Sequence, residues 1–202
     1  MKILVTGGAG FIGSHLVNKL LNEGEEVMVL DNLSRGKSEN VPDSARFIVM
    51  DIRDPRIAKL FKSEHFDAVV HLAGQTMVSA SIKNPVLDAR ENIFGLINLL
   101  QAVRYSGVRR FIFSSTAAVY GDVSEEYLPI SEHQTPAPTS FYGLSKLTAE
   151  RYIIMYQSMY GLDYVILRFS NVFGELQGDS SEGGVISIFS KCVANQLGWG
   201  GV

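Results

Sequence analysis

The chain has 202 residues, of which 46% are hydrophobic and 19% are charged, and its formal net charge is −3. This length and balance allow a sizeable core and exclude a disordered or fibrous protein, and the lack of a basic excess argues against nucleic acid or an anionic membrane as a partner. The lone cysteine, Cys192, and four scattered histidines offer neither a disulfide framework nor a metal site. Since no apolar run reaches membrane-span length, we expect a cytoplasmic protein without a metal or a membrane partner.

Short β-branched runs alternate along the chain with longer segments of helical periodicity. Six runs are predicted strands, at residues 3–5, 27–30, 47–50, 68–72, 111–114 and 164–167. Four segments are predicted helices, at residues 12–23, 55–63, 86–106 and 141–161. Nearly continuous apolar strands separated by helices are typical of a parallel sheet covered on both faces. The predicted fold class is therefore α/β, a doubly wound Rossmann sheet with strand order 3-2-1-4-5-6.

A glycine-rich turn follows the first predicted strand. Gly8, Gly10 and Gly13 have the spacing G-x-G-x-x-G, and Gly7, Gly10 and Gly13 have the wider spacing G-x-x-G-x-x-G. Between a strand and a helix, such glycines permit a tight turn and let backbone N–H groups approach a pyrophosphate at the helix N-terminus. Taken alone, the pattern is equally an ordinary β-to-α turn.

An acid closes the second predicted strand. Asp31 stands 18 residues after Gly13, where a carboxylate can accept hydrogen bonds from ribose hydroxyls and repel a 2′-phosphate. This position favours NAD over NADP as the cofactor. Arg35 lies close by in sequence and could soften that preference, although a solvated arginine in a turn is the more common case.

Two further segments follow predicted strands and are expected to contact the cofactor. In this fold class the carboxyl ends of the strands line the ligand crevice. For Asp51 the alternative is simple loop capping. The segments are Asp51 and Ile52 after the third strand, and Leu72, Ala73, Gly74 and Gln75 after the fourth.

Tyr142 and Lys146 stand four residues apart in a predicted helix, so they share one face. We expect the Lys146 charge to stabilise the Tyr142 phenolate and to lower the tyrosine pKa from about 10, which would make it a base near neutral pH. Alone, this spacing is usually ordinary helix surface. Ser114 and Thr116 end the fifth strand at the same crevice, where a hydroxyl can donate to a substrate oxygen as it becomes a carbonyl.

Taken together, these motifs resemble those of the extended short-chain dehydrogenase/reductases. Their order and spacing are most similar to the NAD-dependent nucleotide-sugar epimerases and dehydratases, and among these to the UDP-glucose 4-epimerases. The resemblance extends from residue 2 to about residue 190. The segments that carry it are 6–13, 31–34, 71–75, 114–121, 142–146 and 167–174.

The resemblance implies a role for each matching residue. Tyr142 would be the acid/base, Lys146 its electrostatic partner and a ribose ligand, and Thr116 the hydroxyl on the reacting oxygen. Gln75 and Asn171 would join Thr116 and Tyr142 in binding the substrate. The implied cofactor contacts are Gly7, Gly10, Phe11, Ile12, Gly13, Asp31, Asn32, Asp51, Ile52, Leu72, Ala73, Gly74, Asn92, Ser114, Tyr142 and Lys146.

The implied activity is NAD-dependent epimerisation of a nucleotide sugar, a UDP-hexose such as UDP-glucose or UDP-galactose, through a transient 4-keto sugar. The implied assembly is a homodimer. Sugar dehydratases of the family carry an Asp-Glu pair directly after the threonine, where this chain has Ala117 and Ala118, so epimerisation is favoured over dehydration. A non-catalytic NAD-binding module and a nucleotide-sugar reductase are the alternatives.

The resemblance also implies two domains. Residues 1–174 would form the NAD-binding Rossmann domain, and residues 175–202 the start of a substrate-binding lobe. Family members carry a longer C-terminal lobe, so we expect this one to be truncated. The tail 196–202, with Trp199 among glycines, matches nothing in the family pattern and is interpreted as a truncated or frameshifted end.

Overall fold

The computed structural model describes residues 1–177, 189–190 and 193. The chain divides into two compact units, Met1–Phe169 and Ser170–Val202. The expected division into residues 1–174 and 175–202 stays a prediction. The tail 196–202 lies outside the described residues.

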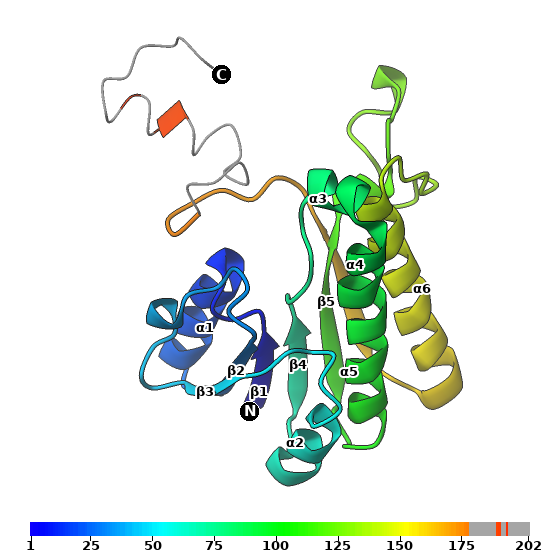
Figure 1. The fold of residues 1–202 in the computed structure, drawn as a ribbon. Coiled ribbons are helices and arrows are strands. Elements are labelled where there is room, and N and C mark those ends of the chain that lie inside the picture. Colours follow the sequence, from blue (N-terminus) through cyan, green and yellow to red (C-terminus); the bar gives the residue numbers. More distant parts are fainter. Residues whose placement is uncertain (178–188, 191–192, 194–202) are drawn as a thin grey trace. The chain divides into compact units, whose positions relative to one another are not determined.

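Six strands form one parallel sheet in the order β3-β2-β1-β4-β5-β6 (Figure 1). The predicted fold class and strand order are confirmed, and the parallel register brings the carboxyl ends Thr6, Asp31, His71 and Thr116 to one edge. We call this the carboxyl edge. The strands are β1 (Lys2–Thr6), β2 (Glu26–Asp31), β3 (Arg46–Val49), β4 (Ala68–His71), β5 (Arg110–Thr116) and β6 (Tyr164–Phe169).

Helices connect the strands, and the apolar core lies between the helices and the sheet. One core cluster includes Val17 of the first helix with Val5 and Val29 of the sheet. A larger cluster, on the side of the later helices, includes Phe111 and Ile153. The α-helices are α1 (Phe11–Asn22), α2 (Ile57–Glu64), α3 (Val78–Lys83), α4 (Pro85–Ala89), α5 (Gly95–Arg104) and α6 (Phe141–Tyr160), and the 3-10 turns are η1 (Ser38–Asn40), η3 (Ala117–Val119) and η4 (Glu125–Tyr127).

The predicted helix over residues 86–106 is interrupted. α4 and α5 are joined by a π-helical turn, η2 (Arg90–Phe94), which takes up one extra residue. α3 was not predicted, since six residues are too few to establish a helical period.

Residues 121–140 form a largely exposed loop, which projects beyond the carboxyl edge (Figure 1). Its two ends meet at Gly121, which has φ +67°. A Cβ placed on Gly121 would lie 2.0 Å from the carbonyl oxygen of Ala137. The base of the loop is therefore closed by backbone packing.

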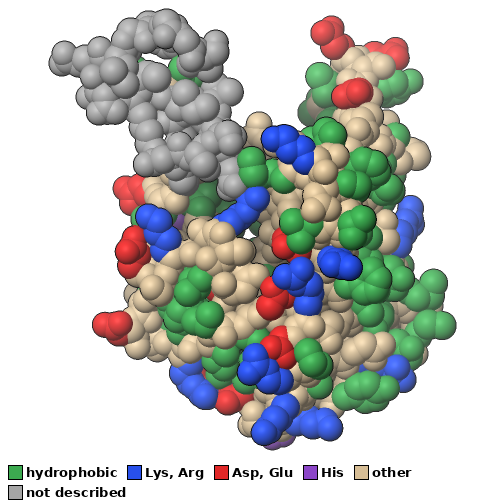
Figure 2. Space-filling model, viewed as in Figure 1, with side chains coloured by type: hydrophobic (Ala, Val, Ile, Leu, Met, Phe, Trp, Pro, Cys, Tyr) green, Lys and Arg blue, Asp and Glu red, His purple; other side chains and the backbone are tan. Residues whose placement is uncertain are grey.

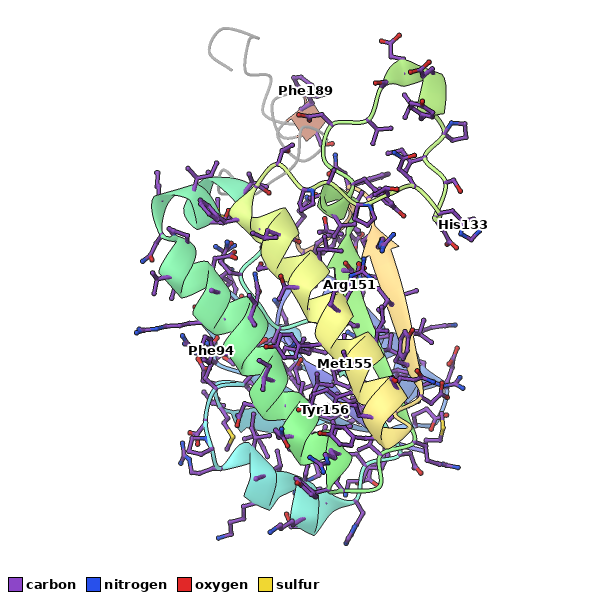
Figure 3. The ribbon with its side chains drawn as sticks, turned by 90° about the vertical axis from the view of Figure 1, so that its right-hand side faces the viewer. Phe94, His133, Arg151, Met155, Tyr156 and Phe189 are labelled. Atoms are coloured by element: carbon purple, nitrogen blue, oxygen red, sulfur yellow. The ribbon has the colours of Figure 1, made fainter. Side chains whose placement is uncertain are left out.

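Hydrophobic side chains are exposed along η2 and α6, toward the right-hand side of Figure 2. Figure 3 shows these two helices side by side, with Phe94 and Met155 labelled on them. Phe94 is 66% exposed and Met159 is 65% exposed. We define the η2–α6 apolar surface by Phe94, Tyr152, Met155 and Met159, all of which are exposed.

Among the described residues, no helix is long and apolar enough to cross a membrane. Over the same residues, no three metal-binding side chains gather in one place.

Candidate active site

The turn between β1 and α1 is too tightly packed to admit side chains. Gly7 has φ +74°, in the left-handed region that favours glycine. A Cβ on Gly13 would lie 2.1 Å from the Gly7 carbonyl oxygen. Gly10 is the N-cap of α1 and has no side chain to accept from the first-turn N–H groups. The turn therefore presents bare backbone donors at a helix N-terminus, as a pyrophosphate cradle requires.

Asp31 ties the end of β2 to the glycine-rich turn. Its Oδ2 accepts a hydrogen bond from the Ala9 N–H at 3.0 Å, and its Oδ1 accepts one from the Leu33 N–H at 2.9 Å. The side chain is buried, so these bonds fix the carboxylate in one place. The Arg35 guanidinium donates to Thr76 Oγ1 at 3.3 Å.

Asp51 is held by its own loop. Arg53 donates to it from Nε and Nη2, both at 2.7 Å, and Asn32 donates from Nδ2 at 2.9 Å. The hydrogen bonds from Arg53, above all, hold the pKa of the Asp51 carboxyl well below its usual range. Loop capping is thus realised for Asp51, while a cofactor contact stays a prediction. The neighbouring Ile52 is buried against Gly95, where a Cβ would lie 2.5 Å from Ile52 Cδ1.

A buried imidazole joins β1 to β4. His71 Nδ1 and Thr6 Oγ1 share a hydrogen bond of 2.7 Å. Burial first, and the positive charge of Lys146 second, lower the pKa of His71 to about 3. The ring stacks on Phe113 at a centroid distance of 5.8 Å, so His71 is a neutral packing residue next to the site.

Tyr142, Lys146 and Thr116 meet where β5 ends beside α6. Ser140 caps α6 by accepting from the Gly143 N–H at 3.0 Å, which sets the start of the helix one residue before Tyr142. The Thr116 side chain lies close enough to the Tyr142 hydroxyl to lower its pKa. Lys146 Nζ donates to the Ser114 carbonyl oxygen at 3.0 Å and lies 4.9 Å from the centre of the Phe113 ring.

The expected lowering of the Tyr142 pKa is wrong for the protein by itself. Burial raises the Tyr142 pKa, the hydrogen bond from Thr116 opposes this, and the charge of Asp88 adds to the rise. Lys146 shares a helix face with Tyr142 as predicted, but its ammonium is engaged by Ser114 and Phe113. Burial also lowers the pKa of Lys146, to about 8, so the lysine keeps its charge at neutral pH.

A buried polar cluster supports α6 from α4 and η2. Asn92 Nδ2 donates to the Gln75 carbonyl oxygen at 3.0 Å, to Ser145 Oγ at 3.1 Å and to Asp88 Oδ1 at 3.2 Å. Gln75 Nε2 also donates to Asp88 Oδ1, at 2.8 Å. All four side chains are buried. Within the described part of the chain, Asn92 Oδ1 alone is a buried side-chain nitrogen or oxygen without a hydrogen-bond partner.

The residues fit a dinucleotide at two places. The glycine-rich turn would clash with any side chain, so it leaves room for a ligand approaching the backbone. The unpaired Asn92 Oδ1 lies beside Gly74, where a Cβ would be 2.5 Å from it, so a buried acceptor is present at the carboxyl end of β4. Such an acceptor is costly unless something donates to it.

The remaining predicted contacts are placed less distinctively. Phe11 and Ile12 begin α1 and are partly buried, and Leu72 and Ser114 are partly buried after or within the ends of β4 and β5. Asn171 is exposed and belongs to the second unit. Its contact with the substrate stays a prediction.

Sequence reasoning missed several residues that hold the site together. Asp88 stands four residues before Asn92, Ser145 three after Tyr142, and Glu150 four after Lys146. Each shares a helix face with a predicted residue, since positions three or four apart are neighbours on a helix. That spacing is the signal that could have identified them.

Comparison with known proteins places the chain in a family. The sequence profile of the NAD dependent epimerase/dehydratase family matches residues 3–199. A putative UDP-glucose 4-epimerase of Methanocaldococcus jannaschii is 45% identical over 196 residues, which are 96% of this chain and 64% of that protein. The UDP-glucose 4-epimerase of Lacticaseibacillus casei is 42% identical over 89% of this chain and 54% of its own length.

Solved structures agree. The UDP-glucose 4-epimerase of Thermus thermophilus in complex with NAD has a TM-score of 0.93 and 45% identity, over 98% of this chain and 64% of that one. The Thermotoga maritima UDP-glucose 4-epimerase with UDP-glucose has a TM-score of 0.93 and 42% identity, over 96% and 63%. This chain thus spans less than two thirds of the length of these proteins. It belongs to the NAD-dependent epimerase/dehydratase family.

Proposed function

We propose that the chain is the cofactor-binding part of a nucleotide-sugar 4-epimerase that interconverts UDP-glucose and UDP-galactose through a 4-keto sugar. The observation that carries the proposal is the meeting of Tyr142, Thr116 and Lys146 at the carboxyl edge. In this arrangement Tyr142 would transfer a proton, Thr116 would donate a hydrogen bond and Lys146 would supply a buried cation. The names of the Methanocaldococcus, Thermus and Thermotoga relatives support this activity.

NAD, when bound, would supply the hydride acceptor and a positive ring charge at the reacting centre. Gly7, Gly10 and Gly13 would hold the pyrophosphate of NAD. Asn92 Oδ1 would accept a hydrogen bond from a donor group of the dinucleotide. Asp31 would bind the adenosine ribose, which favours NAD over NADP. Because two backbone N–H groups fix the Asp31 carboxylate, we expect NAD to bind at least about tenfold more tightly than NADP, roughly 1.4 kcal/mol. Equal affinities by calorimetry would remove Asp31 from this role.

Tyr142 would move the proton. Its Oη would take the proton of the sugar 4-hydroxyl and later return it, while Thr116 would donate a hydrogen bond to the same sugar oxygen. Burial raises the Tyr142 pKa further above neutral pH, so Tyr142 needs a positive charge within about 6 Å before it can act as a base. Lys146 would keep a cation in the site and bind the nicotinamide ribose, and Gln75 and Asn171 would bind the substrate.

The alternatives fit less well. Dehydration needs a further acid and base after the threonine, and Ala117 and Ala118 occupy those positions in η3. A non-catalytic NAD-binding module would have no need of Thr116 beside the Tyr142 hydroxyl. A reductase would consume free NAD(P)H with net redox, which an epimerase does not.

The assembly and compartment follow from separate features. The η2–α6 apolar surface would pair with its copy in a homodimer, because exposed apolar patches of this kind mark association sites. Monomeric behaviour by light scattering at micromolar concentration would contradict this. A cytoplasmic location agrees with the single cysteine, Cys192.

The proposal is tested on the purified chain and on a version extended to the full length of its relatives. Mass spectrometry and absorbance would detect copurified NAD, and a coupled assay would follow conversion of UDP-galactose. We expect NAD to copurify with both proteins. The kcat/KM of the 202-residue chain should be at least about a hundredfold lower than that of the extended protein, because remote nucleotide contacts help to position the sugar. An extended protein that binds NAD but converts no UDP-sugar would refute the proposal.

A further inference from the structure

Glu150 is a buried carboxylate on the face of α6 that carries Tyr142 and Lys146. It lies four residues after Lys146 and eight after Tyr142, so the three side chains follow one another along the helix. Glu150 is only 2% exposed. A buried charge is costly unless it is paired, so its partners decide what it does.

Its partners belong to the two strands beneath the helix. Arg168 of β6 donates from Nε to Glu150 Oε1 at 2.9 Å and from Nη2 to Oε2 at 2.6 Å. Ser115 of β5 donates from Oγ to Glu150 Oε1. Ser115 and Arg168 are paired in the β5–β6 register. The Arg168 side chain is completed by Tyr120, whose hydroxyl accepts from Nη1 at 2.8 Å.

The position of Ser115 in β5 links the Glu150–Arg168 ion pair to the strand residues next to Lys146 and Tyr142. Ser115 stands between Ser114, whose carbonyl accepts from Lys146, and Thr116, whose side chain lowers the Tyr142 pKa. Side chains alternate between the two faces of a sheet along a strand. The Ser115 side chain therefore lies on one face, and the side chains of Ser114 and Thr116 lie on the other. Whatever fixes Ser115 relative to α6 also fixes its two neighbours.

We propose that the Glu150–Arg168 ion pair, through Ser115, is a positioning device that holds the end of β5 in register with α6 so that Thr116 reaches Tyr142 and Ser114 reaches Lys146. Its effect on turnover rests on the proposed epimerase function; its effect on the Tyr142–Thr116 contact does not. Glu150 and Arg168 are positioning residues and are assigned no contact with substrate.

A second ion pair provides a matched control. Arg110 and Asp163 join the same two strands at their amino ends, with 2.7 Å between Nη2 and Oδ2, and their side chains are 57% and 54% exposed. A purely stabilising role would make the two pairs equivalent in kind. A positioning role confines the effect on Tyr142 to the Glu150–Arg168 pair.

The test uses the 202-residue chain with 3-fluorotyrosine at position 142, whose pKa is read from its fluorine chemical shift. The double variant Glu150→Gln/Arg168→Gln leaves the net charge unchanged, and it does not alter Asp88 of α4 or Lys146 of α6, the charged groups around Tyr142. Because Thr116 lowers the Tyr142 pKa, loss of its contact with Tyr142 should raise the fluorotyrosine pKa.

The control and a milder variant keep the test decisive. Arg110→Gln/Asp163→Asn should leave the fluorotyrosine pKa unchanged. If the Glu150/Arg168 variant does not fold, Ser115→Ala removes the link without touching the ion pair and should raise the pKa in the same direction, whereas Ser115→Thr, which keeps the hydroxyl, should restore it. An unchanged or lower pKa in Ser115→Ala, or an equal rise in the control, would overturn the proposal.

Turnover separates this inference from the proposed function. In an extended protein that converts UDP-galactose, Glu150→Gln/Arg168→Gln should lower kcat about tenfold and leave KM within about twofold, because only the proton-transfer geometry is disturbed. An unchanged kcat would contradict the positioning role. If the wild-type protein has no turnover, the proposed function fails while the fluorotyrosine result still stands or falls by itself.

Discussion

The two edges of the sheet use polar groups in opposite ways. At the amino edge, where the strands begin, the arginines of the Arg109–Asp67 and Arg110–Asp163 ion pairs are more than half exposed. At the carboxyl edge the polar groups are buried: His71 pairs with Thr6, Lys146 with Ser114, and Glu150 with Arg168 and Ser115.

The difference shows where the molecule accepts an energetic cost. Exposed ion pairs contribute little to stability, typically about 0.2–1 kcal/mol, and do little harm when absent. Buried ionisable groups lose solvation that their partners only partly restore, so stability alone does not explain them. A cluster of perturbed, buried groups at the carboxyl edge therefore indicates a working site, and the amino edge indicates a scaffold.

The largest expected effect concerns Tyr142. Tyr142→Phe in an extended protein should lower turnover by about a hundredfold or more while NAD stays bound, because only the proton-transfer group is lost. Lys146→Ala should weaken both turnover and NAD binding. Coupled assays and calorimetry measure the two effects. Retention of more than about a tenth of wild-type turnover in Tyr142→Phe would show that Tyr142 is not the base.

A second prediction compares two glycines. Gly13→Ala places a Cβ 2.1 Å from the Gly7 carbonyl oxygen, so the backbone must move, and we expect a loss of about 2–3 kcal/mol in unfolding free energy together with weaker NAD binding. Gly24→Ala meets nothing within 4 Å and should cost only about 1 kcal/mol through its left-handed φ of +82°. Urea melts and NAD titrations would distinguish them; equal NAD affinity in Gly13→Ala and wild type would contradict the cradle.

The buried imidazole predicts a pH dependence of stability. The pKa of His71 is lowered from 6.5 to about 3 in the folded protein. Above pH 6.5 the His71 imidazole is therefore neutral in both the folded and the unfolded state. Below that pH only the unfolded state takes up the proton, and stability should fall by about 1.4 kcal/mol per pH unit, roughly 2 kcal/mol by pH 5. Urea melts at pH 7 and pH 5 measure the fall. His71→Gln should reduce it, and an unaltered fall in that variant would assign it to other groups.

The smallest effect should come from the amino edge. Replacing Arg110 and Asp163 together by glutamine and asparagine should change the unfolding free energy by no more than about 0.5 kcal/mol, because both side chains are more than half exposed. Thermal melts at low and high salt provide the measurement. A loss above about 2 kcal/mol would erase the distinction between the two edges.

The sequence carried most of the fold and part of the site. Strand order and helix positions followed from periodicity, and the glycine-rich turn and Asp31 followed from spacing, because these signals are local. The π-helical turn at η2 and the buried partners of Asn92 did not follow, since they depend on contacts between distant segments. The direction of the Tyr142 pKa was missed for a similar reason: helical spacing gives proximity to Lys146, but burial is a property of the whole fold.

The closed base of loop 121–140 separates two kinds of change. Thr116 lies just before the loop and Tyr142 just after it, yet Gly121 packs on Ala137, and Gly143 packs so closely on η3 that a Cβ would be 2.6 Å from the Ala118 carbonyl oxygen. The part of the loop beyond that base can change in length or sequence while Thr116 and Tyr142 keep their spacing. Sequence change at the loop tip is therefore separated from the packing that sets the Thr116–Tyr142 spacing.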